Sequence, residues 1–140
     1  MYRAAVSVHM TRFEADTPRE RRKLFADAVS AHRDRGSAFL TIEAERLDDI
    51  DGEGPGPWIQ FADQTFNMDV TEGELDRLKT LLSEFPEFRI DQLESPEEAE
   101  GTNVRITARS DANRLAGFAD RVFQAVYGRD DAYRAWVTAV

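Results

Sequence analysis

The amino-acid sequence predicts an α+β domain with one mostly antiparallel sheet of about five strands and helices on one face of that sheet. Three stripes of apolar residues at helical spacing are separated by five segments in which apolar and polar residues alternate. Each alternating segment has one apolar side, which is typical of an antiparallel sheet that is covered on one face only. The expected order of elements is α-β-β-β-α-β-β-α, with an extension at each end.

The chain of 140 residues is long enough for one hydrophobic core, and we expect a single domain over residues 1–140. Its core is expected at residues 17–128, with extensions at 1–16 and 129–140. Residues 2–13 alternate weakly, which favours a strand without excluding a helix. The tail has room for one or two helical turns or for a final strand.

The first helix is expected to begin at Thr17, because Thr17, Pro18 and Glu20 have the spacing of a capping box with proline at the first helical position. Gly36 supplies a C-terminal stop. The apolar stripe between these ends consists of Leu24, Phe25, Ala28, Val29 and His32.

Three strands are predicted next, at residues 38–46, 58–62 and 66–70, because each alternates with period two. Residues 47–57 between the first two are acidic and rich in glycine and proline, which indicates a loop. A turn at residues 63–64 joins the second strand to the third.

A second capping box at Thr71 and Glu74 opens the next helix, which is expected to end before Pro86. Its apolar stripe consists of Leu75, Leu78, Leu81, Leu82 and Phe85. A strand is predicted from about residue 88, followed by a loop at 94–101.

The clearest strand of the chain is predicted at residues 103–109, because Val104, Ile106 and Ala108 alternate with polar residues. Ser110 or Asp111 is expected to cap the third helix. Its apolar stripe consists of Leu115, Phe118, Val122, Phe123, Val126 and Tyr127, and Gly128 ends it.

The composition is strongly acidic, with two lysines, sixteen arginines and 27 aspartates and glutamates, a formal charge of −9 and no cysteine. It resembles the proteins of halophilic archaea, whose surfaces stay hydrated in concentrated salt. The absence of cysteine excludes disulfides and thiolate chemistry. No apolar run approaches the roughly 20 residues of a membrane span, so we expect a cytoplasmic protein without membrane contact. The acid excess argues against nucleic-acid binding.

No motif indicates an enzyme, a cofactor or a metal site. The only histidines are His9 and His32, and no nucleophile elbow accompanies them. The acidic residues at 48–53 resemble a calcium loop faintly, but the bidentate glutamate that such a loop requires is missing. The glycines at 52–56 are not followed by the lysine of a phosphate loop. We therefore predict a protein without catalytic activity.

The segments AFLTIEAE and PWIQFADQTFNMDV, followed by LDRLKTLLSEFPEF, resemble the Tir-chaperone and YbjN-like family, which has the fold of type III secretion chaperones. The similarity covers about residues 17–128 and rests on the order of elements, a WIQF strand, a leucine-rich helix that ends in Phe-Pro and a final amphipathic helix. The resemblance implies a homodimer with a non-enzymatic role in binding other polypeptides.

The alternation places two aromatic residues, Phe39 and Trp58, on the otherwise polar face of the sheet, next to Gln60. Either the tail that carries Trp136 covers them, or they anchor an interface with another protein. The predicted function is therefore a chaperone-like or adaptor module that binds a protein partner in a high-salt cytoplasm.

An alternative function is a regulatory module that binds a small ligand or nucleic acid. Arg105, Arg109 and Arg114 would then form a patch of anion contacts near the start of the third helix, where the helix dipole also favours anions.

Overall fold

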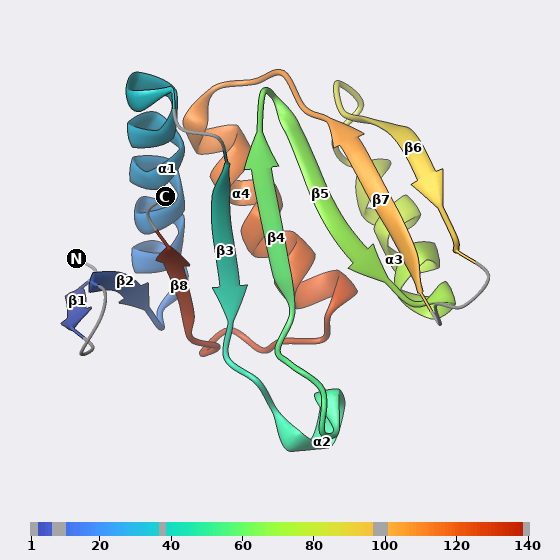
Figure 1. Ribbon diagram of the computed structural model, residues 1–140, viewed down its shortest axis with the longest axis horizontal. Coiled ribbons are helices and arrows are strands. Elements are labelled where there is room, and N and C mark those ends of the chain that lie inside the picture. The colour runs from blue at the N-terminus through green and yellow to red at the C-terminus, as the bar shows by residue number, and fades with distance from the viewer. Residues whose placement is uncertain (1–2, 7–10, 37–38, 97–100, 139–140) are drawn as a thin grey trace.

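The computed structural model describes residues 3–6, 11–36, 39–96 and 101–138, with side chains from Phe13 onward (Figure 1). Its strands are β1 (Arg3–Val6), β2 (Thr11–Ala15), β3 (Leu40–Ala44), β4 (Trp58–Ala62), β5 (Thr65–Val70), β6 (Arg89–Glu94), β7 (Thr102–Thr107) and β8 (Ala135–Thr138). Its helices are α1 (Pro18–Arg35), α2 (Asp48–Asp51), α3 (Glu72–Leu82) and α4 (Ala112–Arg121), and α4 continues into a π-helical turn, η1 (Val122–Val126).

In the described part of the chain, the strands form one open, antiparallel sheet of eight strands in the order β1-β2-β8-β3-β4-β5-β7-β6. The α+β class and the antiparallel sheet are confirmed, and the five predicted strands correspond to β3 through β7. The expected number of about five strands is wrong, because the two end segments contribute β1, β2 and β8. Their short alternating patterns carry too little information to identify them as strands without their partners.

The segment expected as a C-terminal extension lies inside the sheet, where β8 pairs with β2 on one side and with β3 on the other. Val137 lies opposite Ile42 and Ala135 lies opposite Ala44, and all four side chains are buried. β8 thus continues the apolar surface of β3, and β2 reaches the rest of the sheet through it.

The helices α1, α3 and α4 lie on one face of the sheet, behind the strands in the view of Figure 1. Each begins where the sequence predicts a cap. Thr17 Oγ1 accepts a hydrogen bond from Glu20 N at 3.2 Å, and Thr71 and Glu74 form a complete capping box. Of the two candidates for the third cap, Asp111 fills the position and accepts a bond from Arg114 N at 2.8 Å.

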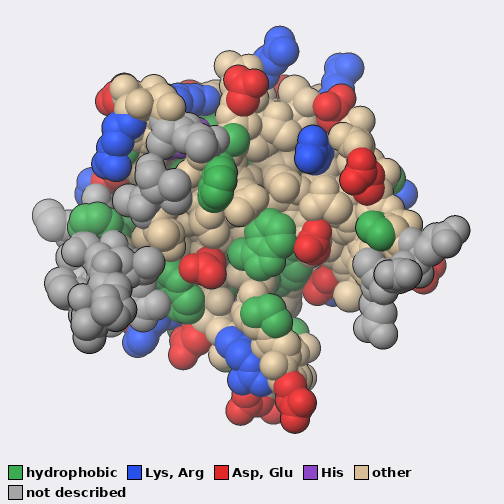
Figure 2. Space-filling model, viewed as in Figure 1, with side chains coloured by type: hydrophobic (Ala, Val, Ile, Leu, Met, Phe, Trp, Pro, Cys, Tyr) green, Lys and Arg blue, Asp and Glu red, His purple; other side chains and the backbone are tan. Residues whose placement is uncertain are grey.

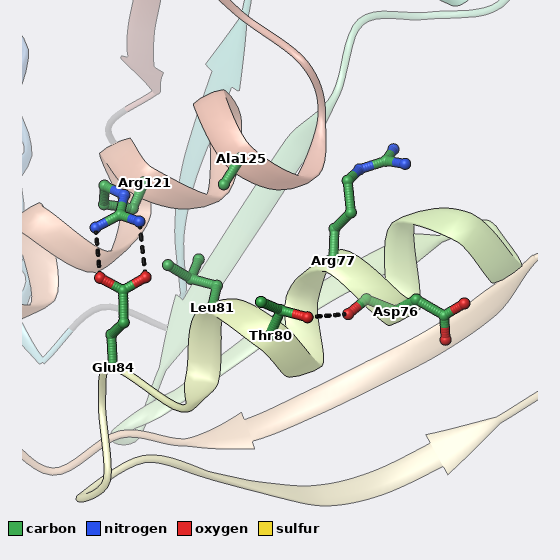
Figure 3. Close-up of a pocket in the computed structure, with 7 residues that line it drawn as sticks. All are labelled: Asp76, Arg77, Thr80, Leu81, Glu84, Arg121 and Ala125. Carbon is green, nitrogen blue, oxygen red and sulfur yellow. Dashed lines mark hydrogen bonds and ion pairs between the residues drawn. The ribbon is translucent and has the colours of Figure 1, made fainter.

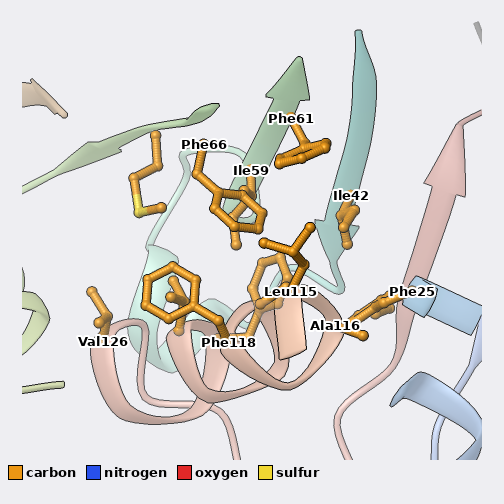
Figure 4. Close-up of a cluster of buried hydrophobic side chains, with 14 of the residues drawn as sticks. Phe25, Ile42, Ile59, Phe61, Phe66, Leu115, Ala116, Phe118 and Val126 are labelled. Carbon is orange, nitrogen blue, oxygen red and sulfur yellow. The ribbon is translucent and has the colours of Figure 1, made fainter. Parts of the chain in front are cut away.

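The core lies between the sheet and these helices (Figure 4). Phe61 and Phe66 face each other across β4 and β5, with ring centroids 4.9 Å apart, and Phe118 of α4 lies 5.3 Å from Phe66. These rings are at most 1% exposed, so folding removes nearly all of their apolar area from water. The predicted apolar stripes of the helices and strands supply almost the whole core.

The acidic loop at residues 47–57 differs from the prediction, because Asp48–Asp51 form the short helix α2. Asp51 Oδ2 accepts a hydrogen bond from Leu47 N at 2.7 Å and forms an ion pair with the buried Arg129. Arg129 also donates to the carbonyl of Glu45 at 3.0 Å. These bonds attach the loop to the segment that leads into β8.

Candidate functional site

The open face of the sheet lies opposite α1, α3 and α4, and no described helix covers it. Figure 2 shows this face, where apolar side chains gather near the centre with carboxylates around them. Along β3, β4, β5 and β8, half-buried or exposed residues alternate with buried ones, as Thr41 and Glu43 alternate with Ile42. The three residues predicted for this face, Phe39, Trp58 and Gln60, take outward positions. The same face also carries Thr41, Glu43, Asn67, Arg105 and Thr107.

Two tryptophans lie on the open face, on either side of Glu43. The register of β3 places Glu43 opposite Trp58 of β4 and opposite Trp136 of β8. Both indoles are half-buried, and Trp136 Nε1 donates a hydrogen bond to Glu43 Oε2 at 2.7 Å. Residues 135–138 therefore lie in the plane of the sheet, separated from Trp58 by β3, rather than over its ring.

A shallow hollow of about 320 Å³ opens on the same face, where its lining begins at Gln60, two residues after Trp58 on β4. It is lined by Phe39, Gln60, Ala62, Thr65, Asn67 and Arg105. Phe39 is 39% exposed, and Arg105 is exposed as well. The hollow thus brings together Phe39 and Gln60, which the sequence indicates as interface residues, with Arg105, which it indicates as an anion contact.

The other two predicted anion contacts lie elsewhere. Arg109 is exposed in the loop after β7. Arg114 lies in the helical layer, where it donates to Glu87 at 2.9 Å and stacks on the Phe85 ring, 4.1 Å from its centroid. Its hydrogen bond lowers the pKa of Glu87, so this carboxylate is ionised and holds the guanidinium. The structure therefore does not unite Arg105 and Arg114 in one patch.

A groove of about 280 Å³ lies between α3 and the end of α4 (Figure 3). Its polar groups already bind one another. Arg121 donates two hydrogen bonds to Glu84, at 3.1 and 2.9 Å, and Arg77 donates to the carbonyl of Val126 at 2.9 Å. Thr80 donates to the carbonyl of Asp76. The groove is better explained by contacts that join the two helices than by ligand binding.

A second hollow of about 280 Å³ lies over α4, and its lining includes Arg22, Arg114 and Arg121. All three of these cations are ion-paired. Arg22 lies 3.8 Å from Asp120, while Arg114 and Arg121 bind Glu87 and Glu84, which both follow α3 in the chain. An incoming anion would have to displace these carboxylates. In the hollow on the sheet face, no described carboxylate is paired with Arg105. This hollow is therefore the stronger candidate for a ligand site.

Arg21 is a buried charge that the sequence analysis did not identify. It is 0% exposed, donates to Asp120 Oδ1 at 2.9 Å and to the carbonyls of Asp131 and Tyr133, and lies over the Tyr133 ring. Tyr133 also donates to Asp120 Oδ1 at 2.8 Å. Helical spacing places Arg21 on the stripe of Leu24, and this is the signal that could have revealed it. The cluster joins α1, α4 and the segment before β8, which is a structural role.

The remaining observations do not indicate a reaction centre. His32 is buried against the ring of Phe61, and its burial, followed by the charge of Arg33, lowers its pKa. His9 lies outside the described residues. Within the described ranges, the structure has no group of three or more histidines and carboxylates that could hold a metal ion, and it has no helix of the length and apolarity that crossing a membrane requires.

Comparison with known proteins assigns the chain to a family. No curated protein and no solved structure matches it. A family model described as a family of unknown function (DUF7975) matches residues 10–140, so it covers the sheet from β2 to β8 and every helix of the fold. The chain belongs to the DUF7975 family.

Proposed function

We propose that this protein is a non-enzymatic binding module that holds a polypeptide partner on the open face of its sheet. The observation that carries the proposal is Trp58, a half-buried indole on the interior strand β4, on a face that no described helix covers (Figure 1). Tryptophan is the residue type most enriched among the anchors of protein interfaces. Among the described residues, no group accepts a hydrogen bond from its indole nitrogen, so the N–H is available to a partner.

The surroundings of Trp58 also fit a polypeptide partner. An interface needs an apolar centre and a rim of polar groups that bind water or the partner. Here Trp58 and Phe39 supply the apolar centre, while Thr41, Gln60 and Arg105 supply the polar groups. The chaperone-like or adaptor role that the resemblance implies, and the working environment of high salt that the composition favours, belong to the same proposal.

Photo-crosslinking from chosen positions of the chain tests this function. A photoreactive amino acid is placed at Thr41 on the open face and, as a matched control, at the exposed Asn113 on α4. Cells that produce each variant are irradiated, and adducts are identified by mass and then remade with the purified partner. We expect a defined protein adduct from position 41 and none from position 113. Equal adducts from both positions, or none from position 41, would contradict the proposal.

The second candidate, recognition of an anion, is favoured by one observation only. Arg105 is exposed on the face and lines the hollow, and no described carboxylate lies within 4.0 Å of its guanidinium. Its distance from Arg114 argues against a nucleic acid, which would require several cations on one surface. The anion in question is therefore small, or is part of the polypeptide partner.

A further inference from the structure

We infer that the hollow beside Phe39 recognises a single carboxylate, presented as an aspartate or glutamate side chain by the partner polypeptide, and that Arg105 is its ionic contact. The inference rests on the proposed function and specifies the chemistry of the partner. It follows from three features of the hollow: a guanidinium without a described partner, amide groups that remain able to donate, and an aromatic wall.

Arg105 differs from the other described arginines that line the three hollows. Arg22, Arg114 and Arg121 are paired with carboxylates, and Arg77 donates to the carbonyl of Val126. Arg105 has neither kind of partner among the described residues, although 27 acidic residues accompany 18 basic ones. The cross-strand neighbours of Arg105 are instead Asn67 and Gln92, which are neutral. Because no described carboxylate of the protein pairs with the guanidinium of Arg105, this group is available to a carboxylate of another molecule.

The amide of Asn67 is oriented so that it supports this contact. Asn103 Nδ2 donates to Asn67 Oδ1 at 2.7 Å and to Asp69 Oδ1 at 2.8 Å. Because the oxygen of Asn67 already accepts a bond, its Nδ2 group remains as a donor in the lining of the hollow. Gln60, opposite Asn67 in the register, has no described side-chain partner and adds a second amide.

These donors match a carboxylate better than a phosphate. A guanidinium presents two parallel N–H groups to the two oxygens of one carboxylate, and neighbouring amide donors can complete the shell. Phosphate sites usually add further cations or the backbone amides of a helix start, and neither lines this hollow. The face also carries Glu43 and Asp69, which repel a second negative charge. The acidic residue is therefore expected to have neutral, apolar or basic neighbours.

The position of Trp58 fixes the spacing of the recognised segment. Trp58 and Gln60 are two residues apart on β4, which corresponds to about 7 Å along a strand. An extended segment that lies on the face directs alternate side chains toward it, also about 7 Å apart. The segment is thus expected to carry an apolar side chain over Trp58 and an acidic side chain two positions away, in the hollow.

A synthetic peptide array tests the inference. The array holds acetylated and amidated peptides, so that only side chains supply carboxylates, and it is probed with the full chain at the potassium chloride concentration that stabilises it best. Three proteins are compared: the natural chain, Arg105→Glu and the matched control Arg109→Glu, which changes the charge equally at an exposed site outside the hollow. We expect the natural chain and R109E to select peptides with an acidic residue two positions from an apolar one.

R105E should bind those peptides at least about tenfold more weakly, as expected for the loss of a charge-assisted hydrogen bond, and should select lysine or arginine at the acidic position instead. Peptides that bind the natural chain, R109E and R105E alike, with no preference for an acidic residue, would overturn the carboxylate inference and leave the proposed function standing. Absence of any bound peptide, together with no adduct from position 41, would overturn both. Saturation of the hollow by acetate or inorganic phosphate alone, with no peptide bound, would overturn the choice of a polypeptide.

Discussion

The indole nitrogen of Trp136 donates a hydrogen bond to the carboxylate of Glu43 across β8 and β3, with a distance of 2.7 Å between the two atoms. This bond satisfies the polar end of one tryptophan within the sheet. The other neighbour of Glu43, Trp58, has no equivalent acceptor among the described residues. The two indoles of the open face therefore differ, because only that of Trp136 has an acceptor for its N–H among the described residues.

Replacing Trp58 with alanine should leave the fold intact and weaken association. Because the indole is half-buried and lies outside the core, we expect the melting temperature to change by only a few degrees. Binding to the partner, or self-association if a second copy occupies the face, should weaken by about 2 kcal/mol or more, as for a buried tryptophan anchor. Calorimetry and analytical ultracentrifugation measure the two effects. Unfolding of the variant with unchanged association in the folded fraction would show that Trp58 only supports the fold.

Ile106 and Thr107 are adjacent on β7 and face opposite sides of the sheet. Ile106 is 0% exposed, so Ile106→Asp places a carboxylate without a partner among apolar side chains and should prevent folding. Thr107→Asp introduces the same charge on the open face and should change the free energy of unfolding little. Circular dichroism with urea denaturation compares them, and similar behaviour of the two variants would contradict the register of β7.

Arg21 and Arg22 offer a similar comparison on one helix. Arg21→Met leaves the buried Asp120 without its closest cation and two carbonyls without a donor, so the free energy of unfolding should fall by about 3–5 kcal/mol. Arg22→Met removes a cation that is 52% exposed and 3.8 Å from the same carboxylate, and should cost less than about 1 kcal/mol. Chemical denaturation measures both. If Arg22→Met lowers the free energy of unfolding as much as Arg21→Met does, burial does not determine how much each arginine stabilises the fold.

His32 should make stability depend on pH in the weakly acidic range. Burial lowers its pKa below the ordinary value of 6.5, so the unfolded chain binds a proton at a pH where the folded chain does not. The free energy of unfolding therefore falls as the pH decreases from about 6.5 toward the lower pKa of the folded state. His32→Phe should make the free energy of unfolding depend less on pH in this range. Carboxylates that titrate at lower pH contribute equally to the natural chain and to the variant. Denaturation at several pH values between 7 and 5.5 measures the free energy of unfolding of both proteins. The same change with pH in the natural chain and in the variant would exclude His32 as the cause.

Salt should stabilise the fold. The formal charge of −9 implies repulsion among surface carboxylates, and salt screens this repulsion within a short distance. The melting temperature is therefore expected to rise from low to multimolar potassium chloride. A flat or falling curve would contradict the high-salt environment that the composition suggests.

Local signals in the sequence predicted much of the fold correctly. The caps at Thr17 and Thr71 depend on residues three positions apart, and both helices begin there. The outward positions of Phe39 and Trp58 follow from alternation within a single strand. Such features need only short stretches of chain, so they can be recognised without knowledge of tertiary structure.

Features that depend on distant segments could not be predicted. Residues about 100 positions apart come together where β8 pairs with β2 and β3 and where Arg21 is buried against Asp120. The pattern of residues within one short segment does not show which distant segment it will contact. The same limit applies to the hollow. Phe39, Gln60 and Arg105 were identified as single residues, but their convergence requires the order β3-β4-β5-β7, which alternation within strands does not reveal.

The place of β8 in the sheet has a consequence for biosynthesis. Because β2 joins the rest of the sheet only through β8 among the described strands, the β1–β2 pair cannot complete the sheet until residues 135–138 have left the ribosome. Until then β2 and β3 both present unpaired edges, which are templates for wrong pairing with other nascent chains. Acidic residues on these strands, such as Glu14 on β2 and Glu43 on β3, would repel other acidic chains until β8 is in place.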